Sequence, residues 1–290
     1  MDRIDLNVLD DGSAFPVQVY GKIQKIKQLL SGKKIIVAFS GGVDSSTLLV
    51  LALKFAKEVR AVHFDSIFNS VGEKEHAQGI AKLLKIELHV MKKDPLACDD
   101  VRKNPPDRCY FCKKENFSDV VDLMKKLKFD QVAEGSNADD AGDYRPGMKA
   151  VAELGLISPL LAAGLSKEEI RQIARAVKLP NAEKPSSPCL ATRFAYGVEI
   201  TGDLIVAVGT AEAIIKARYP DITTVRARVH EGNTLRIEID PASLERLLSK
   251  DASGLLDLGK QLKKLGFTKV SLDLEGYRTG SLNDLIKKEE

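Results

Sequence analysis

The chain has 290 residues, of which 44% are hydrophobic and 29% are charged, and these values are close to the averages for soluble proteins. At about 100 to 200 residues per domain, this length predicts two domains with enough apolar side chains for a hydrophobic core. Charges interrupt every apolar run before the roughly 18 residues needed to cross a bilayer, and the first ten residues include three Asp. We therefore expect neither a membrane span nor a secretory signal.

Net charge and cysteine content argue against two classes of protein, nucleic-acid-binding proteins and secreted disulfide-rich proteins. The formal net charge is only +3, and the aromatic content is 6% with no Trp, so a general nucleic-acid-binding surface is not expected. Four cysteines are too few for a secreted disulfide framework and fit a reducing compartment, which predicts a cytoplasmic protein.

Strand and helix patterns alternate in the first half of the chain. A short apolar run that is β-branched at its start predicts a strand at residues 35–39, and further strands are expected at 60–64, 86–91 and 131–134. Helical spacing of apolar residues predicts helices at 43–57 and 72–84. Such alternation is typical of an α/β fold in which helices cover both faces of a parallel sheet.

The middle of the chain holds a loop, a helix and an irregular segment. Residues 92–108 are rich in Asp, Pro and Lys and predict a loop that leads into a helix at about Cys109. Ser166 and Glu169 have the spacing of a capping box, so a helix is expected to run to about Val177. Residues 181–197 then become irregular, and we place a domain boundary there, with domains at 1–197 and 198–290.

The second domain has a different pattern. A helix is expected at residues 203–217, alternating strands at 223–229 and 234–239, a helical region at 242–265 and a last strand at 269–274. This order predicts a small α+β domain that contains an antiparallel hairpin.

A glycine-rich loop follows the first predicted strand. It reads Ser40-Gly41-Gly42-Val43-Asp44-Ser45-Ser46 and leads directly into a helix, where backbone N–H groups and the positive helix end can hold an anion. Glycines allow close approach to phosphate, the serine hydroxyls add donors, and Asp44 could hold Mg²⁺. The loop has no Lys, so it is not the GxxxxGK[ST] nucleotide loop. A plain Gly-Gly turn with a serine helix cap is the alternative.

Three cysteines form a candidate metal site. Cys109 and Cys112 are one helical turn apart beside basic residues, and such surroundings lower a thiol pKa. Cys189, in the irregular segment, could join them, and three thiolates suit a 4Fe-4S cluster with one open iron. Zinc and a redox CxxC pair are alternatives. Cys98 is interpreted as a small buried hydrophobic residue.

The loop resembles the PP-loop of the ATP pyrophosphatase superfamily. This resemblance implies an adenine nucleotide alpha hydrolase-like fold, a loop that binds the pyrophosphate of ATP with Mg²⁺, and adenine packed near Ala38. Further stretches resemble the LarE family over nearly the whole chain: residues 134–140, 143–147, 158–160, 189–197 and 225–230. That family converts pyridinium-3,5-biscarboxylic acid mononucleotide to thiocarboxylate forms for the nickel-pincer nucleotide cofactor.

The LarE resemblance also implies residue roles. Cys189 matches the residue that transfers sulfur, and in some members this cysteine gives up its own sulfur. Because Cys109 and Cys112 are also present, the chain looks like the members in which three cysteines hold a 4Fe-4S cluster, which puts the sacrificial role in doubt.

The remaining candidates would bind the substrate. Arg193, Arg226 and Arg228 offer planar bidentate donors to phosphate and carboxylate, Thr192 adds a hydroxyl, and Glu212 matches an acidic position near the family's site. The alternative is that Arg226 and Arg228 lie on a solvated strand face and that Glu212 is a solvated helix charge. Residues 144–147 are interpreted as a turn. The family also suggests a homo-oligomer, namely a hexamer.

Two other functions compete with this interpretation. A 4Fe-4S-dependent tRNA thiolase of the same superfamily also combines a PP-loop with three cysteines, although the low net charge argues against RNA binding. A regulator that binds nucleotide and metal without turnover is the alternative from another class.

Overall fold

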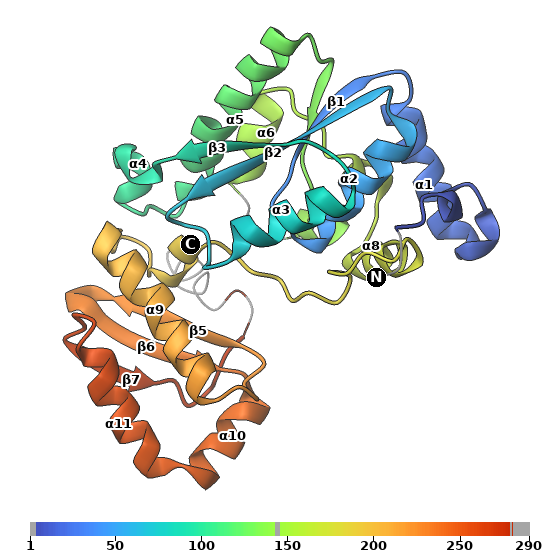
Figure 1. Cartoon of the computed structure of the whole chain (residues 1–290). Coiled ribbons are helices and arrows are strands. Elements are labelled where there is room, and N and C mark those ends of the chain that lie inside the picture. Colours follow the sequence, from blue (N-terminus) through green and yellow to red (C-terminus); the bar gives the residue numbers. More distant parts are fainter. Residues whose placement is uncertain (1–3, 143–145, 279, 281–290) are drawn as a thin grey trace. The chain divides into compact units, whose positions relative to one another are not determined.

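The computed structural model describes residues 4–142, 146–278 and 280, and the chain divides into two compact units (Figure 1). The N-terminal unit extends over residues 1–66, 71–93 and 109–187, and the C-terminal unit over residues 67–70, 94–108 and 188–290. Two short segments from the first half of the chain thus belong to the C-terminal unit. A boundary between independently folding domains after Gly197 stays a prediction.

The N-terminal unit is built on a parallel sheet of four strands. They are β1 (Lys34–Ala38), β2 (Glu58–Ser66), β3 (Leu88–Lys93) and β4 (Gln131–Ala133), in the spatial order β3-β2-β1-β4. Ile36 of β1 pairs with Arg60 of β2 on one side and with Val132 of β4 on the other. The predicted α/β fold is therefore confirmed, and β1 lies inside the sheet.

Helices cover both faces of this sheet because β1 is apolar on both faces. Ile35 and Val37 are fully buried in a core shared with α1, α2, α3 and α8, whereas Ile36 is buried against α5 and α6. Figure 1 shows α5 and α6 on one side of the sheet and α2 and α3 on the other. The helices of the unit are α1 (Val17–Leu30), α2 (Val43–Phe55), α3 (Glu73–Leu83), α5 (Arg108–Leu127), α6 (Gly147–Glu153), α7 (Pro159–Ala163) and α8 (Lys167–Ala176).

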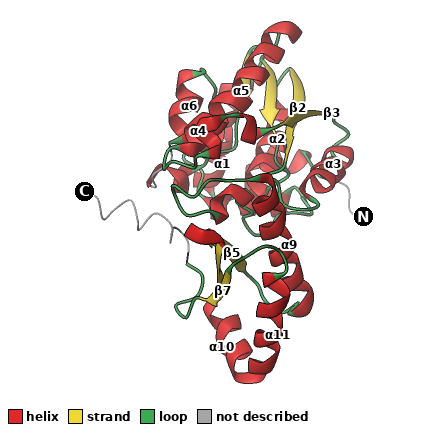
Figure 2. Cartoon of the chain, turned by 90° about the vertical axis from the view of Figure 1, so that its left-hand side faces the viewer, coloured by secondary structure: helices red, strands yellow, loops and turns green. Residues whose placement is uncertain are grey.

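The C-terminal unit is a three-stranded sheet with helices packed against it. Strand β6 (Thr234–Ile239) lies in the middle, antiparallel to β5 (Val225–His230) and parallel to β7 (Lys269–Leu272). Helix α9 (Gly202–Arg218) packs on β5 and α11 (Ala252–Lys263) on β7 (Figure 2). The predicted α+β character and the hairpin are present, with the turn at Gly232 in the left-handed region (φ +64°).

Two expected elements differ from the structure. The helical region at 242–265 is two helices, α10 (Pro241–Lys250) and α11, because Asp251 leaves helical geometry and its carboxylate accepts a hydrogen bond from Gly254 N at 2.9 Å. The loop at 92–108 contains a short helix, α4 (Asp99–Arg102). Short 3₁₀ turns occur at Asn7–Leu9, Gly12–Ala14, Pro95–Ala97, Ala138–Gly142, Leu190–Arg193 and Glu231–Asn233.

Within the described part of the chain, no helix is long and apolar enough to cross a membrane. Residues 143–145, which belong to one of the LarE-like stretches and to the turn expected at 144–147, lie outside the described residues.

Candidate active site

The glycine-rich loop lies where the chain order of the sheet reverses. Ala38 is the last residue of β1, and α2 begins at Val43. Strand β1 is flanked by β2 on one side and by β4 on the other, so the strand order changes direction at β1. The carboxyl end of β1 therefore lies at the switch point of the sheet, where α/β folds bind ligands. The loop therefore has the position expected of a nucleotide-binding element.

Hydrogen bonds within the loop hold it in a tight turn. Ser45 Oγ donates to Gly42 O at 3.1 Å and accepts from Ser40 N at 3.3 Å, and Gly42 N donates to Ser40 Oγ at 3.3 Å. Gly41 has φ of +79°, and a Cβ there would lie 3.1 Å from Ala77 Cα on α3. Only glycine combines this backbone conformation with so close a neighbour.

Asn181 fastens the loop from a distant part of the sequence. This residue is buried, and its amide nitrogen donates to Gly41 O at 2.9 Å and to Ser46 Oγ at 2.8 Å. Ser46 is itself fully buried and helps to hold the loop through this bond, and its expected role as a donor to phosphate stays a prediction. Sequence patterns had marked residues 181–197 only as irregular.

The N-terminus of α2 has open donors and a carboxylate with one unused oxygen. Gly42 is the N-cap residue, and no side chain caps the helix. The side chain of Asp44 forms an ion pair with Lys167 through Oδ2, whereas its buried Oδ1 has no hydrogen-bond partner in the described structure. An orphaned carboxylate oxygen beside open N–H groups fits a hard cation such as Mg²⁺ with a bound phosphate.

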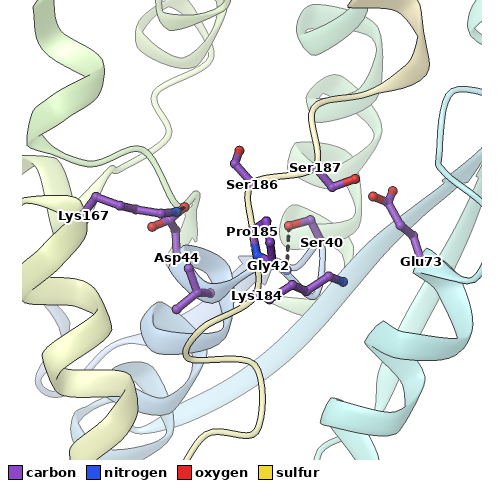
Figure 3. Close-up of a pocket in the computed structure, with 10 residues that line it drawn as sticks. Ser40, Gly42, Asp44, Glu73, Lys167, Lys184, Pro185, Ser186 and Ser187 are labelled. Carbon is purple, nitrogen blue, oxygen red and sulfur yellow. Dashed lines mark hydrogen bonds and ion pairs between the residues drawn. The ribbon is translucent and has the colours of Figure 1, made fainter. Parts of the chain in front are cut away.

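A polar cavity of about 150 Å³ lies in front of this helix end (Figure 3). It is smaller than the roughly 300 to 1,000 Å³ of pockets that enclose a whole small-molecule ligand, and its size and lining suit a phosphate group. Its lining residues come from the loop, α3, α8 and the segment after Asn181: Ser40, Gly42, Val43, Asp44, Glu73, Lys167, Lys184, Pro185, Ser186 and Ser187.

Cys109 and Cys112 lie on the first turn of α5 in the N-terminal unit. Both are half-buried, and Asn116 Nδ2 donates to Cys112 Sγ at 3.6 Å. The neighbouring Lys113 forms an ion pair with Glu134, with 3.3 Å between the charged atoms. Glu134 directly follows β4. Burial alone would raise the pKa of Glu134, but Lys113 and hydrogen bonds from two serines outweigh it and hold that pKa below its usual value.

Cys189 lies on a turn in the C-terminal unit, where it is exposed. Thr192 Oγ1 donates to Cys189 O at 2.8 Å, and Arg193 donates to Pro188 O at 3.0 Å. Thr192 and Arg193 therefore fix the backbone that presents the Cys189 thiol. Cys98 belongs to the same unit and is half-buried, whereas it was interpreted as a small buried hydrophobic residue.

Arg193 and Glu212 form a buried ion pair. Arg193 Nε donates to Glu212 Oε1 at 2.7 Å and its NH2 group donates to Oε2 at 3.1 Å, in the bidentate geometry that arginine favours. The side chains are 2% and 9% exposed, and Ala227 N also donates to Glu212. Glu212 is thus not the solvated helix charge considered as an alternative.

Arg226 and Arg228 on β5 are also withdrawn from solvent, but they differ in their partners. Arg228 is buried and donates to Glu238 at 3.0 Å and to Thr192 O at 2.7 Å. Arg226 is half-buried over the Tyr277 ring and has no carboxylate partner among the described residues. Burial and the nearby Arg193 lower the pKa of Arg226. Of the three arginines Arg193, Arg226 and Arg228, Arg226 is the one without a carboxylate partner among the described residues, so it can accept an anionic ligand.

The predicted residues fall into two groups, one in each unit. The N-terminal unit contains the loop with Ala38 and the pair Cys109 and Cys112, and the C-terminal unit contains Cys189, Thr192, Arg193, Glu212, Arg226 and Arg228. The three cysteines are thus divided between the units. Within the described residues, no three His, Cys, Asp or Glu side chains are gathered to hold a metal ion. Their roles as ligands stay predictions.

Several residues of the site were not predicted from the sequence. Lys167, Lys184 and Asn181 reach the loop from positions more than 100 residues away, and no local pattern reports such a contact. The capping box of Ser166 and Glu169 is present in the structure and fixes the start of α8 at Lys167. This local pattern places Lys167 at the helix N-terminus but does not indicate its contact with the loop.

Comparison with known proteins is consistent with this geometry. Residues 34–98 match the family model described as queuosine biosynthesis protein QueC. The chain is 34% identical over 260 residues to the pyridinium-3,5-bisthiocarboxylic acid mononucleotide synthase of Lactiplantibacillus plantarum, and the alignment covers 88% of this chain and 91% of that protein.

Two further relatives align over a similar length. An uncharacterized protein of Synechocystis is 35% identical over 270 residues, covering 92% of this chain and 98% of that protein. An uncharacterized protein of Methanocaldococcus jannaschii is 31% identical over 256 residues, covering 88% of this chain and 94% of that protein.

Proposed function

The chain belongs to the LarE family of PP-loop ATP-using enzymes, and from this premise we propose that it thiolates pyridinium-3,5-biscarboxylic acid mononucleotide. ATP adenylylates a carboxylate of this substrate, pyrophosphate leaves, and sulfur replaces AMP to give a thiocarboxylate for the nickel-pincer nucleotide cofactor. The observation that carries this proposal is the loop at residues 40–46, with its uncapped helix end and the unused Asp44 oxygen.

Activation by ATP is required by the chemistry of the substrate. A carboxylate is a poor electrophile because it is anionic and would have to expel oxide. The N–H groups at the start of α2 can stabilise the phosphate oxygens, and Asp44 would hold Mg²⁺, which neutralises charge on the departing pyrophosphate. These groups act at one end of the sheet, where β1 delivers the loop.

The substrate side of the site belongs to the C-terminal unit. Arg226 is the cation best placed to bind a phosphate or carboxylate, because Arg193 and Arg228 are already paired with Glu212 and Glu238. Thr192 and Arg193 then act by holding the Cys189 turn in place. A thiolate at Cys189 is a soft nucleophile suited to displacing AMP.

The cysteines fit a 4Fe-4S cluster by their donor chemistry. Cys109, Cys112 and Cys189 would hold it, and a bound cluster with three protein ligands supplies one iron that can carry sulfide. Direct donation of the Cys189 sulfur is the alternative, and it would consume the enzyme after one turnover.

Iron analysis separates these two routes. Protein purified without oxygen is expected to contain about four irons and matching acid-labile sulfide per chain. Cys109→Ala, Cys112→Ala and Cys189→Ala should each lose the iron, and the control Cys98→Ala should keep it. Protein without iron or zinc would contradict the cluster, and mass spectrometry should then find Cys189 lacking one H₂S after turnover.

Two further expectations concern partners. Filter binding with tRNA should give no salt-sensitive affinity, whereas measurable affinity with a steep salt dependence would favour a tRNA thiolase. Light scattering on a size-exclusion column tests the expected homo-oligomer, for which the family suggests a hexamer.

A further inference from the structure

The cavity in front of α2 contains two lysines with different partners. Lys167 reaches Asp44 from α8 and forms an ion pair with it. Lys184 extends across the lower edge of the cavity toward the side from which Glu73 points (Figure 3). Its ammonium group has no hydrogen bond or ion pair with any residue that the structure describes.

An ammonium group in this position is unfavourable without an anion. Burial lowers the pKa of Lys184, and the more distant charge of Glu73 compensates only in part. Burial and then the charge of Lys184 also lower the pKa of His76, whose imidazole interacts with the Gly41 backbone. Removing a cation from water without a close partner costs free energy, which an anionic ligand would recover.

The surroundings of Lys184 identify the class of anion. The uncapped end of α2 opens into the same cavity, and the hydroxyls of Ser40, Ser186 and Ser187 belong to its lining. Main-chain N–H groups, hydroxyls and a lysine ammonium are typical donors to phosphate oxygens. The volume of about 150 Å³ is too small to enclose a whole nucleotide and suits a phosphate chain.

We propose that Lys184 binds the β- and γ-phosphates of ATP and stabilises pyrophosphate as it leaves. This inference rests on the proposed function. In the step, a carboxylate oxygen of the substrate bonds to the α-phosphorus while the bond from that phosphorus to the β-bridging oxygen breaks. The electron pair leaves with pyrophosphate, no proton is transferred, and Lys184 remains an ammonium throughout.

Binding of magnesium pyrophosphate and of AMP by calorimetry tests this role. Lys184→Gln removes the charge, Lys184→Arg retains it, and Lys178→Gln changes an exposed lysine outside the cavity. Lys184→Gln should weaken pyrophosphate binding by about tenfold or more, as expected for a lost charge-assisted hydrogen bond. Lys184→Arg should lose less pyrophosphate affinity than Lys184→Gln, and Lys178→Gln should bind pyrophosphate as wild type does. The affinity for AMP should be unchanged in all three variants.

Two results would overturn the assignment. One is equal pyrophosphate affinity in wild type and Lys184→Gln. The other is a parallel loss of AMP and pyrophosphate binding, which would mean that Lys184 only shapes the cavity. Thermal unfolding provides the folding control, since Lys184→Gln removes a half-buried charge that has no close partner and should be no less stable than wild type.

Failure of the proposed function would look different. Wild-type protein that binds pyrophosphate through Lys184, but releases none from ATP in the presence of the pyridinium substrate, would refute the thiolation reaction and leave the Lys184 assignment standing.

Discussion

At the scale of single residues, Arg193 has two contacts: its buried ion pair with Glu212 and its hydrogen bond to Pro188 O beside Cys189. Because both side chains are almost fully enclosed, removing one charge leaves the other buried without a partner. Glu212→Gln should therefore reduce the free energy of unfolding by roughly 3 to 5 kcal/mol, as measured by urea denaturation.

A double variant separates the structural role from the chemical one. Arg193→Met with Glu212→Leu replaces the pair by apolar side chains and should recover much of the stability, because buried pairs are often replaceable in this way. The turn that presents Cys189 would still lose the donor to Pro188 O, so sulfur transfer should stay impaired. A double variant as unstable as Glu212→Gln would contradict this account.

Asp240 carries a pH-dependent contribution to stability. Burial alone would raise the pKa of this carboxyl, but hydrogen bonds from Thr223, Thr224 and Ser243 outweigh it and lower the pKa to about 2. Since the folded-state pKa lies below the unfolded one, the contribution is present above about pH 4 and is lost as the pH falls toward 2.

Asp240→Asn tests this contribution without losing the helix cap, because Asn caps helices as well as Asp does. The variant should be less stable by about 1 kcal/mol at pH 7, a value reduced for solvent screening. Urea denaturation at pH 7, 5 and 3 should show that the difference in free energy of unfolding between variant and wild type becomes smaller as the pH falls. A constant difference would refute the electrostatic explanation.

At the scale of elements, the junction of β1, the loop and α2 depends on Gly41. Gly41 and Gly32 both have positive φ, at +79° and +75°, but only Gly41 faces a close neighbour, Ala77 on α3. Gly32→Ala is therefore a matched control, because it adds the same backbone strain with no atom within 4 Å of the new Cβ.

Gly41→Ala should be the more damaging change. Both variants should lose about 1 to 2 kcal/mol of stability from the left-handed backbone. Only Gly41→Ala must also displace α3 or the loop, so its affinity for ATP should fall by about tenfold or more while that of Gly32→Ala stays near wild type. Equal ATP affinities would mean that the loop tolerates a side chain at this position.

Elements with strong local patterns were predictable from the sequence. The β-branched run of β1, the Gly-Gly turn and the capping box of α8 each follow from adjacent residues, and each is present in the structure. The break between α10 and α11 was missed because apolar spacing continues across Asp251, whose side chain instead caps α11. Helix α1 was also absent from the prediction.

The candidate site was only partly predictable for a related reason. Alternation on β5 identified Arg226 and Arg228 but could not tell a solvated face from a buried one, because burial depends on what packs above the strand. Lys184 and Asn181 reach the loop through tertiary contacts that leave no local pattern. The LarE resemblance identified candidate residues, and the structure supplied their partners.

At the scale of the whole molecule, the residues proposed for adenylylation and for sulfur transfer are distributed over the two units. The nucleotide loop belongs to the N-terminal unit, whereas Cys189 and the arginines belong to the C-terminal unit, together with residues 67–70 and 94–108 from earlier in the chain. If the proposed roles are right, the complete reaction uses residues of both units, and adenylylation is the step that must come before sulfur transfer.

Pyrophosphate release is the most direct measurement of that step. The protein is incubated without oxygen with ATP, Mg²⁺ and pyridinium-3,5-biscarboxylic acid mononucleotide, and pyrophosphate and the substrate's mass are followed together. The account predicts pyrophosphate release that requires the substrate, together with a product in which sulfur has replaced a carboxylate oxygen. Release no greater than in the substrate-free control, with the substrate unchanged in mass, would contradict it.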